Sequence, residues 1–342
     1  MSHLAALIKH VTEDHGTLTQ HQGRAALHEM LEGNAADEEI AALLTAIASR
    51  GPTVEELSGF VQGMRAMSRP LPLTNEERDQ LVDTCGTGGD SRGTFNISTA
   101  AALVTAAAGV KVAKHGNRGL TSRCGSADVL EALGIPVELP PDRSVACLRQ
   151  TGFMFLYAPS LHPAMKRVQP IRRALGFRTI FNLAGPLTNP AGARAQLVGV
   201  FAPPAVNLVA ETLSRLGVRH AFVVHGQDGL DELTLNGPSN VAEIREQTIR
   251  RFTVEPGNAG LAQAPLHSVA GGDAQENARL IELILQGEPG PRRDVVLLNA
   301  AAALLIAGRT PDLAQGVRLA ADAIDSGAGV RLLAQLRKFV RS

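Results

Sequence analysis

The chain has 342 residues, enough for a sizeable core and at or above the usual length of one domain. Its 33 basic and 33 acidic side chains give a formal net charge of zero, which argues against binding of nucleic acid through an extended basic surface. Aromatic residues make up only 3% of the chain, so Ala, Leu, Val and Ile must build most of the core.

The first 70 residues predict helices only. Residues 23–33, 36–51 and 53–67 each place apolar side chains at i, i+3, i+4 and i+7. Thr53 and Glu56 form a capping-box pattern at the start of the third helix. Two prolines within residues 68–74 then predict a boundary or linker.

From residue 80 onward, short apolar runs alternate with helical patterns. Strands are predicted near residues 81–85, 110–116, 196–202 and 220–226, and helices near 98–108, 126–133 and 206–216. This alternation predicts an α/β fold with a mostly parallel sheet. From residue 273 to the end the pattern is again helical.

The cysteines and the N-terminus bear on the compartment. Cys85, Cys124 and Cys147 are odd in number and lack CxxC spacing, so neither a disulfide framework nor a zinc site is indicated. The amphipathic N-terminus carries acidic residues, unlike a secretory signal. No apolar run approaches the roughly 18–20 residues of a membrane span. We therefore expect a cytoplasmic protein with neither a membrane nor a nucleic-acid partner.

A glycine-rich segment follows the first predicted strand. It holds four glycines within eight positions, namely Gly86, Gly88, Gly89 and Gly93. Glycine admits positive φ and close approach of backbone N–H groups to a ligand, and a helix N-terminus favours negative charge. Its spacing matches neither the P-loop nor the dinucleotide fingerprint. The segment predicts an anion site, with a plain structural turn as the alternative.

A second glycine-rich segment, residues 114–128, follows the next predicted strand. Lys114, His115, Arg118 and Arg123 supply groups that are or can become cationic. Ser126 is expected to be the N-cap of the following helix and Gly134 its C′ residue. In a parallel sheet both loops would open at the carboxyl ends of the strands, where ligands bind. A phosphate or diphosphate site is predicted here, and a solvated basic loop is the alternative.

Two further segments carry chemistry. Asp231 and Glu232 are adjacent carboxylates after a turn, a pattern that suits Mg²⁺ beside phosphate oxygens but also suits a solvated acidic turn. Arg172 and Arg173 lie in a helical pattern within residues 158–192, and one guanidinium could face a carboxylate ligand. A solvated arginine pair is the alternative.

Together these segments resemble the anthranilate phosphoribosyltransferases. The resemblance covers nearly the whole chain and depends on several short motifs in the family's order: Gly86–Asp90, Asn96–Thr99, Lys114–Arg118, Gly125–Asp128 and Asp231–Glu232, with His162–Arg172 and Asn182–Asn189. It implies a transferase of tryptophan biosynthesis that joins anthranilate to 5-phosphoribosyl 1-diphosphate. The implied products are N-(5-phosphoribosyl)anthranilate and diphosphate.

The resemblance also implies site residues. The implied phosphoribosyl diphosphate contacts are Gly86, Gly89, Asp90, Thr94, Asn96, Ile97, Ser98, Thr99, Lys114, His115, Gly116, Asn117, Arg118, Gly119, Leu120, Thr121, Ser122 and Ser126. The implied anthranilate contacts are Gly86, Asn117 and Arg172, and the implied ligands of two Mg²⁺ ions per subunit are Ser98, Asp231 and Glu232. No catalytic residue is assigned, because an aniline-type amine is already neutral at pH 7; His115 could assist or be structural.

The implied fold is of the nucleoside phosphorylase and phosphoribosyltransferase class. A small all-helical domain would comprise residues 1–72 with 168–190, and a larger α/β domain residues 73–167 with 191–342, with a homodimer formed through the small domain. One position departs from the family pattern: Cys124 stands where the family commonly has serine, and a thiol is a weak donor. A pyrimidine-nucleoside phosphorylase and a non-catalytic nucleic-acid-binding relative of the same fold remain alternatives, disfavoured by the acidic pair and the zero net charge.

Overall fold

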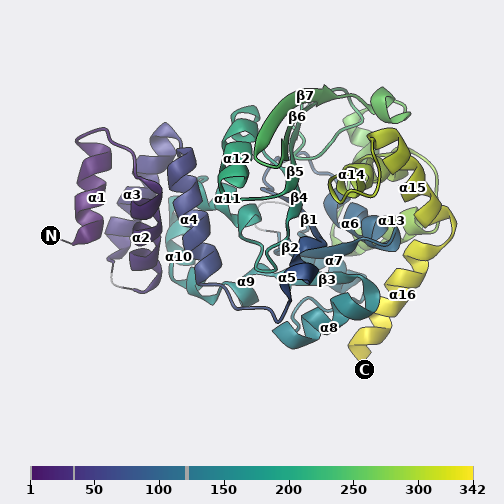
Figure 1. Ribbon diagram of the computed structural model, residues 1–342, viewed down its shortest axis with the longest axis horizontal. Helices are drawn as coiled ribbons and strands as arrows, with labels where there is room; N and C mark the ends of the chain where they lie inside the picture. The colour runs from purple at the N-terminus through teal and green to yellow at the C-terminus, as the bar shows by residue number, and fades with distance from the viewer. Residues whose placement is uncertain (1, 34, 120–122, 342) are drawn as a thin grey trace.

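The computed structural model describes residues 2–33, 35–119 and 123–341. Four helices form a bundle at one end of the molecule, on the left of Figure 1: α1 (His3–Thr12), α2 (Gln20–Leu31), α3 (Asp37–Arg50) and α4 (Val54–Ala66). The capping box at the start of α4 is confirmed, because Thr53 N donates to Glu56 and Glu56 N donates to the Thr53 hydroxyl. The three helices predicted from apolar periodicity are thus α2, α3 and α4.

A seven-stranded sheet forms the centre of the molecule. Its strands are β1 (Leu81–Gly86), β2 (Lys111–Gly116), β3 (Phe153–Tyr157), β4 (Ala195–Gly199), β5 (His220–Gly226), β6 (Ser239–Arg245) and β7 (Thr248–Val254). The order is β3-β2-β1-β4-β5-β6-β7, parallel from β3 to β5 and antiparallel at β6 and β7. The predicted mostly parallel sheet is confirmed, and β3 and the β6–β7 hairpin were not foreseen.

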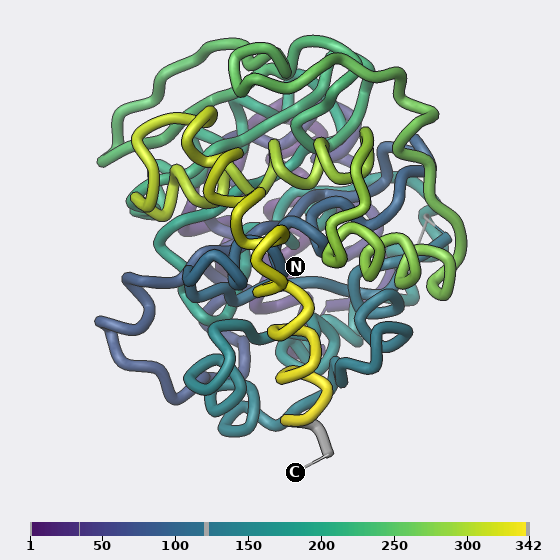
Figure 2. The backbone as a smooth tube through the Cα atoms, turned by 90° about the vertical axis from the view of Figure 1, so that its right-hand side faces the viewer, coloured from purple at the N-terminus to yellow at the C-terminus, as the bar shows by residue number. Residues whose placement is uncertain are grey.

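Helices cover both faces of the sheet (Figure 1). The linking helices are α5 (Asn75–Asp79), α6 (Ile97–Ala107), α7 (Ser126–Ala132), α8 (Pro141–Thr151), α9 (Ala158–Leu161), α10 (Gln169–Leu175), α11 (Ile180–Ala184) and α12 (Pro203–Arg215). The last four are α13 (Ala274–Leu285), α14 (Pro291–Ile306), α15 (Leu313–Asp325) and α16 (Ala328–Arg341), and Figure 2 shows α16 running along the outside of the molecule. The helical C-terminal quarter is therefore confirmed.

Burial on both faces explains why the parallel strands are short apolar runs without alternation. One core, on the side of α6 and α14, includes Val112, Phe153 and Val296. A second core joins the N-terminal helices, α10, α11 and α12 to the opposite face, and includes Phe60, Phe181 and Val223. A smaller third core lies among β2, β3 and α8. The rings of Phe60 and Phe181 meet edge to face with centroids 5.6 Å apart, so the segment after β3 packs back onto the N-terminal bundle.

For α7, the predicted C-terminal glycine is confirmed and the predicted N-cap residue is wrong. Gly134 has a φ of +75° directly after the C-cap residue Leu133, as expected for a C′ glycine. The N-cap, however, is Gly125 rather than Ser126, which is the first helical residue. The reason is that the Asp128 carboxylate accepts the backbone N–H of Gly125 at 2.8 Å, so the helix begins without a side-chain cap from serine.

Candidate functional site

The two glycine-rich loops lie next to each other. They follow β1 and β2, which pair in parallel and end at Gly86 and Gly116. Helix α6 begins at Ile97 after the first loop, and α7 begins at Ser126 after the second. Both helix starts therefore lie on the carboxyl side of the sheet, where the positive end of a helix dipole favours negative charge. Several of their N–H groups already bond within the protein, since Ile97 donates to the Phe95 carbonyl and Ala127 to the Asn117 carbonyl.

The acidic pair reaches this edge from the turn after β5. The backbone N–H of Gly88 donates to Oδ2 of Asp231 at 2.9 Å, and the N–H of Asp231 lies 3.4 Å from Oδ2 of Asp90. Burial raises the pKa of Asp231 to about 7, and the Asp90 carboxylate adds to this. Burial and then the Asp231 charge raise the pKa of Glu232 to about 8. The arrangement thus gathers three carboxyl groups beside the first glycine loop, and the charged forms of Asp231 and Glu232 are favoured only at higher pH or beside a cation.

Two glycines leave the space that the acidic pair occupies. A Cβ on Gly199, the last residue of β4, would lie 1.6 Å from the carbonyl oxygen of Asp231. A Cβ on Gly86 would lie 3.0 Å from Oδ2 of Asp231. Gly86 was predicted, but Gly199 was missed. A lone glycine within an apolar strand is a sign of close backbone approach, and that signal could have found it.

Lys114 is a buried cation at the start of the second loop. Its side chain is 1% exposed, and its ammonium group donates to the Thr84 carbonyl and to the Ser98 hydroxyl, the latter at 3.2 Å. Burial lowers the pKa of Lys114, although the charge of Asp83 opposes that shift. The ammonium therefore ties β1 to the first turn of α6, and it faces inward rather than toward solvent.

Asp128 organises the second loop. Its Oδ2 accepts the backbone N–H groups of Gly119 at 2.9 Å and Gly125 at 2.8 Å. Ser126 Oγ donates to the Asn117 carbonyl at 3.2 Å. Arg118 forms ion pairs with Asp128 and Glu131, so its charge is compensated within the protein. A ligand would have to share or displace those ion pairs to use the Arg118 guanidinium.

Asn96 connects the two loops to α13. Its Nδ2 donates to the Cys124 carbonyl at 3.2 Å, and its Oδ1 accepts from Asn277 Nδ2 at 2.9 Å and from the Cys124 thiol at 3.2 Å. Burial raises the pKa of Cys124 to about 11, so the thiol stays protonated and can donate. Asn277, which sequence analysis did not single out, therefore fixes the orientation of Asn96.

The segment between β3 and β4 contains Arg172, which was predicted to face a carboxylate ligand. Arg172 of α10 lies over the ring of Phe181, with the guanidinium carbon 5.2 Å from the ring centroid, and burial lowers its pKa. No hydrogen bond in the described part of the chain joins Arg172 to Gly86 or Asn117. His115 and His162 lie nearby in the fold with ring centroids 5.3 Å apart. Burial lowers the pKa of His115 to about 3 and that of His162 to about 4, so both rings are neutral.

The structure thus brings most of the predicted residues to one sheet edge, with different roles. Gly89, Asp90 and Gly119 lie in the two loops, and Thr94 pairs with Ala270 in an isolated β-bridge. The strand and helix ends that border the loops hold Gly86, Gly116 and Ser126. Ile97 and Thr99 are buried, and their backbone N–H groups donate to the carbonyls of Phe95 and Asn96. Leu120, Thr121 and Ser122 lie outside the described residues.

Oxygen donors dominate the acidic end of the site. Within the described ranges, no group of three or more His, Cys, Asp or Glu side chains is arranged to hold a metal ion. The Ser98 hydroxyl and the carboxylates of Asp231 and Glu232, whose pKa values are raised, fit a Mg²⁺ site. Water and ligand phosphates supply part of the coordination of Mg²⁺, so such a site needs few protein oxygens. A cation there would offset the burial and the mutual repulsion that raise the pKa values of Asp231 and Glu232.

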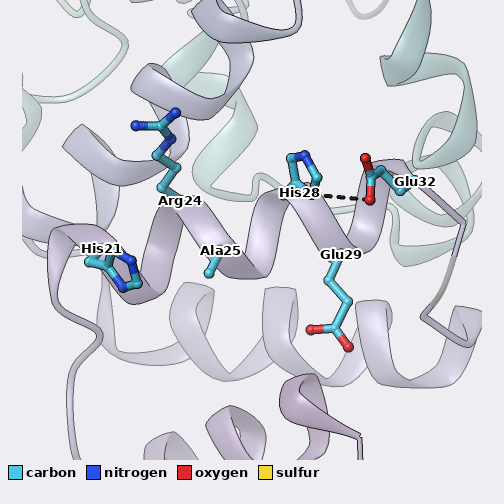
Figure 3. Close-up of a pocket in the computed structure, with 6 residues that line it drawn as sticks. All are labelled: His21, Arg24, Ala25, His28, Glu29 and Glu32. Atoms are coloured by element: carbon cyan, nitrogen blue, oxygen red, sulfur yellow. Dashed lines mark ion pairs between the residues drawn. The ribbon is translucent and has the colours of Figure 1, made fainter.

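A separate hollow of about 410 Å³ lies on the N-terminal bundle, away from the glycine loops. It is lined along α2 by His21, Arg24, Ala25, His28, Glu29 and Glu32, as Figure 3 shows. None of these residues was predicted to bind a substrate. In the part of the chain that the structure describes, no helix is long and apolar enough to cross a membrane.

Comparison with known proteins matches both parts of the chain. Residues 78–330 match the glycosyl transferase family, a/b domain, and residues 5–68 match the glycosyl transferase family, helical bundle domain. A curated relative from Symbiobacterium thermophilum, an anthranilate phosphoribosyltransferase, is 51% identical over 98% of this chain and 97% of its own length. A second, from Solibacter usitatus, is 49% identical and covers 100% of both chains.

Solved structures agree in fold over the full length. The anthranilate phosphoribosyltransferase of Thermus thermophilus superposes with a TM-score of 0.92 at 42% identity, covering 100% of both chains. The Saccharomyces cerevisiae enzyme, solved with PRPP and Mg, gives a TM-score of 0.89 at 26% identity over 99% of this chain and 98% of its own. The same yeast enzyme has been solved with 4-fluoroanthranilate.

Proposed function

The chain belongs to the anthranilate phosphoribosyltransferase family, and we infer from this that it transfers the phosphoribosyl group of 5-phosphoribosyl 1-diphosphate to anthranilate. The products are N-(5-phosphoribosyl)anthranilate and diphosphate, in tryptophan biosynthesis. One observation in the fold carries this function: two glycine loops and a buried acidic pair meet at the same sheet edge. That edge offers N–H donors for a diphosphate and carboxylates for its metal.

We propose that the two loops bind the donor substrate. The first loop would contribute Gly86, Gly89, Asp90, Thr94 and Asn96–Thr99, and the second Lys114–Ser122 with Ser126. The starts of α6 and α7 support this, since the positive ends of both helix dipoles lie at this edge of the sheet. Asn96 and Lys114 already bond within the protein, so we expect them to act mainly by holding the loops in place.

We propose that Ser98, Asp231 and Glu232 hold two Mg²⁺ ions per subunit together with the diphosphate. Magnesium in the yeast relative supports the metal, and the raised pKa values of Asp231 and Glu232 indicate carboxylates in need of a cation. When bound, Mg²⁺ supplies positive charge that stabilises the departing diphosphate. Lys114 lies on the Ser98 side of this site and provides a fixed protein cation.

We propose that Gly86, Asn117 and Arg172 contact anthranilate. The Arg172 guanidinium would face its carboxylate, and the stack on Phe181 supports this by limiting the positions that the guanidinium can adopt. The amine of anthranilate is neutral at pH 7, so the protein needs to orient it toward C1 of the ribose rather than deprotonate it. His115 and His162 are held neutral by burial and are poor candidates for an acid.

We propose that residues 1–72 with 168–190 form the small domain, and that residues 73–167 with 191–342 form the large one. Besides the Phe60–Phe181 contact, the Arg65 guanidinium donates to the Leu187 carbonyl at 2.9 Å, which supports a small domain discontinuous in sequence. We also propose a cytoplasmic location, which the lack of disulfides among Cys85, Cys124 and Cys147 supports.

We further propose a homodimer through the small domain. The row of side chains along α2 in Figure 3 supports it, because the order of its charges complements its own reverse. If two α2 helices lie antiparallel, His21 pairs with Glu32 of the second copy, Arg24 with Glu29, and Ala25 with His28. Glu29 and Glu32 would then exchange their partners within the chain, His3 and His28, for groups of the second copy. Such self-complementarity is what a two-fold interface needs. Sedimentation of Arg24→Glu against the wild type tests it, and an unchanged oligomeric state would remove α2 from the interface.

Anthranilate fluorescence tests the main function. Fluorescence should fall when phosphoribosyl diphosphate and Mg²⁺ are added together, and it should not fall when either is omitted. No fall with well-folded protein would overturn the assignment. Phosphorolysis of a pyrimidine nucleoside would then favour the phosphorylase alternative, and a gel shift the nucleic-acid-binding one.

A further inference from the structure

We propose that Arg178 is a positioning residue that holds the first glycine loop in its binding geometry and thereby sets affinity for the diphosphate group. The proposal rests on the donor-binding role of that loop. Arg178 lies in the segment after β3, between α10 and α11, and none of its atoms belongs to the loop it contacts.

Arg178 makes two contacts at once. Its Nη2 donates to the carbonyl oxygen of Gly89 in the first loop. Its guanidinium carbon lies 4.2 Å from the ring centroid of Phe201, which follows β4. A planar guanidinium can stack on a ring and still donate from its edge, whereas a lysine ammonium has no such fixed fork.

Phe201 is itself bonded to the same loop. The backbone N–H of Phe201 donates to the Thr87 hydroxyl at 3.0 Å, and the N–H of Thr87 donates to the Gly199 carbonyl at 2.9 Å. Arg178, Phe201, Thr87 and Gly89 therefore close a ring of contacts around the start of the loop, which we name the loop clip. The loop is held by Arg178 on one side and by the Gly88–Asp231 hydrogen bond on the other.

The loop needs such support because its backbone is unusually free. Gly88, Gly89 and Gly93 have φ of +62°, +74° and +69°, and the non-glycine Ser91 has φ of +57°. Glycine has the largest backbone entropy to lose on ordering, so an unsupported loop would lose that entropy when a diphosphate binds. The loop clip orders the loop beforehand, and a pre-ordered site binds more tightly.

The clip also links the two proposed substrate sites. Arg172 and Arg178 are carried by the same segment, and Arg172 is seated on Phe181, which in turn contacts Phe60 of α4. Loosening Arg178 should therefore disturb the donor loop first. It should disturb the proposed acceptor contact at Arg172 less, because that contact has its own packing.

Calorimetric titration of the protein with inorganic diphosphate, in the presence of Mg²⁺, tests the loop clip without any turnover. Arg178→Met should raise the Kd for diphosphate roughly tenfold, the effect expected for one charge-assisted hydrogen bond. In steady state, the KM for phosphoribosyl diphosphate should rise by more than the KM for anthranilate, with kcat within about a factor of two to three. Arg178→Lys should restore only part of the affinity.

Two further variants distinguish the effect of the loop clip on diphosphate affinity from the effects of losing a positive charge or of destabilising the fold. Arg173→Met removes the same charge from the exposed end of α10 and should leave diphosphate affinity unchanged. Phe201→Leu removes the ring and should weaken binding, and its effect should be less than additive with that of Arg178→Met. Circular dichroism should show native melting for each variant.

The proposal is overturned if folded Arg178→Met binds diphosphate like the wild type, or if Arg173→Met loses as much affinity. The proposed function fails by a different result, the absence of anthranilate turnover by the wild type. The diphosphate titration still decides the role of Arg178 in that case.

Discussion

The backbone N–H of Gly88 donates a 2.9 Å hydrogen bond to Oδ2 of Asp231, although 143 positions separate the two residues. This bond joins the first glycine loop to the acidic pair. It occupies one lone pair of Asp231 Oδ2, which leaves the second lone pair, the other Asp231 oxygen and Glu232 for the proposed metal. The donor loop and the proposed metal ligands are therefore one structural unit.

Removing the acidic charges should raise the Mg²⁺ requirement. Asp231→Asn combined with Glu232→Gln should increase the Mg²⁺ concentration for half-maximal activity by roughly tenfold or more, equivalent to about 1.4 kcal/mol or more of binding free energy. Glu211→Gln, an exposed carboxylate paired with Arg251, is the matched control. A metal titration of the double variant that overlays that of the wild type would exclude Asp231 and Glu232 as ligands.

Truncating the proposed acceptor contacts should separate the two substrates. Asn117→Ala and Arg172→Ala should each weaken the use of anthranilate more than the use of phosphoribosyl diphosphate. For Arg172 the reason is the loss of a guanidinium opposite a carboxylate, a loss that often reaches about tenfold to a hundredfold. Initial rates with each substrate varied in turn measure this, and equal losses for both substrates would contradict the assignment.

Gly199 should not tolerate a side chain. In Gly199→Ala the new Cβ would lie 1.6 Å from the Asp231 carbonyl oxygen, so the turn that carries the acidic pair must shift. We expect activity to fall by about an order of magnitude or more, since small misplacements of a catalytic site are costly. In Gly257→Ala, where no atom lies within 4 Å of the new Cβ, activity should be retained. Near-normal turnover by folded Gly199→Ala would show that the turn is adaptable.

Serine should replace Cys124 with little effect. In Cys124→Ser the hydroxyl can donate to Asn96 Oδ1 as the thiol does at 3.2 Å, so the link to Asn277 survives. We expect stability within about 0.5 kcal/mol of the wild type and activity close to normal. Denaturant unfolding and initial rates check this. A collapse of activity would mean that the thiol itself is required.

Buried neutral histidines should make the protein sensitive to acid. The folded pKa of His162 is depressed to about 4, whereas an unfolded histidine has a pKa of about 6.5. Below pH 6.5 the unfolded chain binds a proton at His162 that the folded chain does not bind. The free energy of unfolding therefore decreases as the pH falls from 6.5 toward 4. The loss is about 1.4 kcal/mol per pH unit for each such group.

His162→Asn should therefore lose less stability than the wild type between pH 6.5 and 5, by about 2 kcal/mol. His267→Asn, at an exposed histidine outside the proposed dimer interface, provides the control and should lose stability with falling pH as the wild type does. Denaturant unfolding at several pH values measures both. Parallel pH profiles for wild type and His162→Asn would show that another group governs acid sensitivity.

The sequence alone determined the fold class and the location of the two loops. Apolar periodicity and the strand, glycine and helix pattern identified α2 to α4 and the loops after β1 and β2, because these signals are local. Periodicity did not find β3 or the β6–β7 hairpin, since β3 is a short apolar run and β7 is largely exposed. The Ser126 cap was wrong because Asp128, three residues after Gly125, binds the Gly125 N–H.

Only the tertiary structure decided how the site residues divide their work. Sequence could name Asn96, Lys114 and Arg118 as polar residues near a ligand, but their hydrogen bonds go to Cys124, Thr84, Ser98, Asp128 and Glu131. Gly199, Asn277 and Arg178 act on the loops from distant positions in the chain. Spacing in a sequence reports which groups a local segment presents, whereas contacts between distant segments depend on how the whole chain packs.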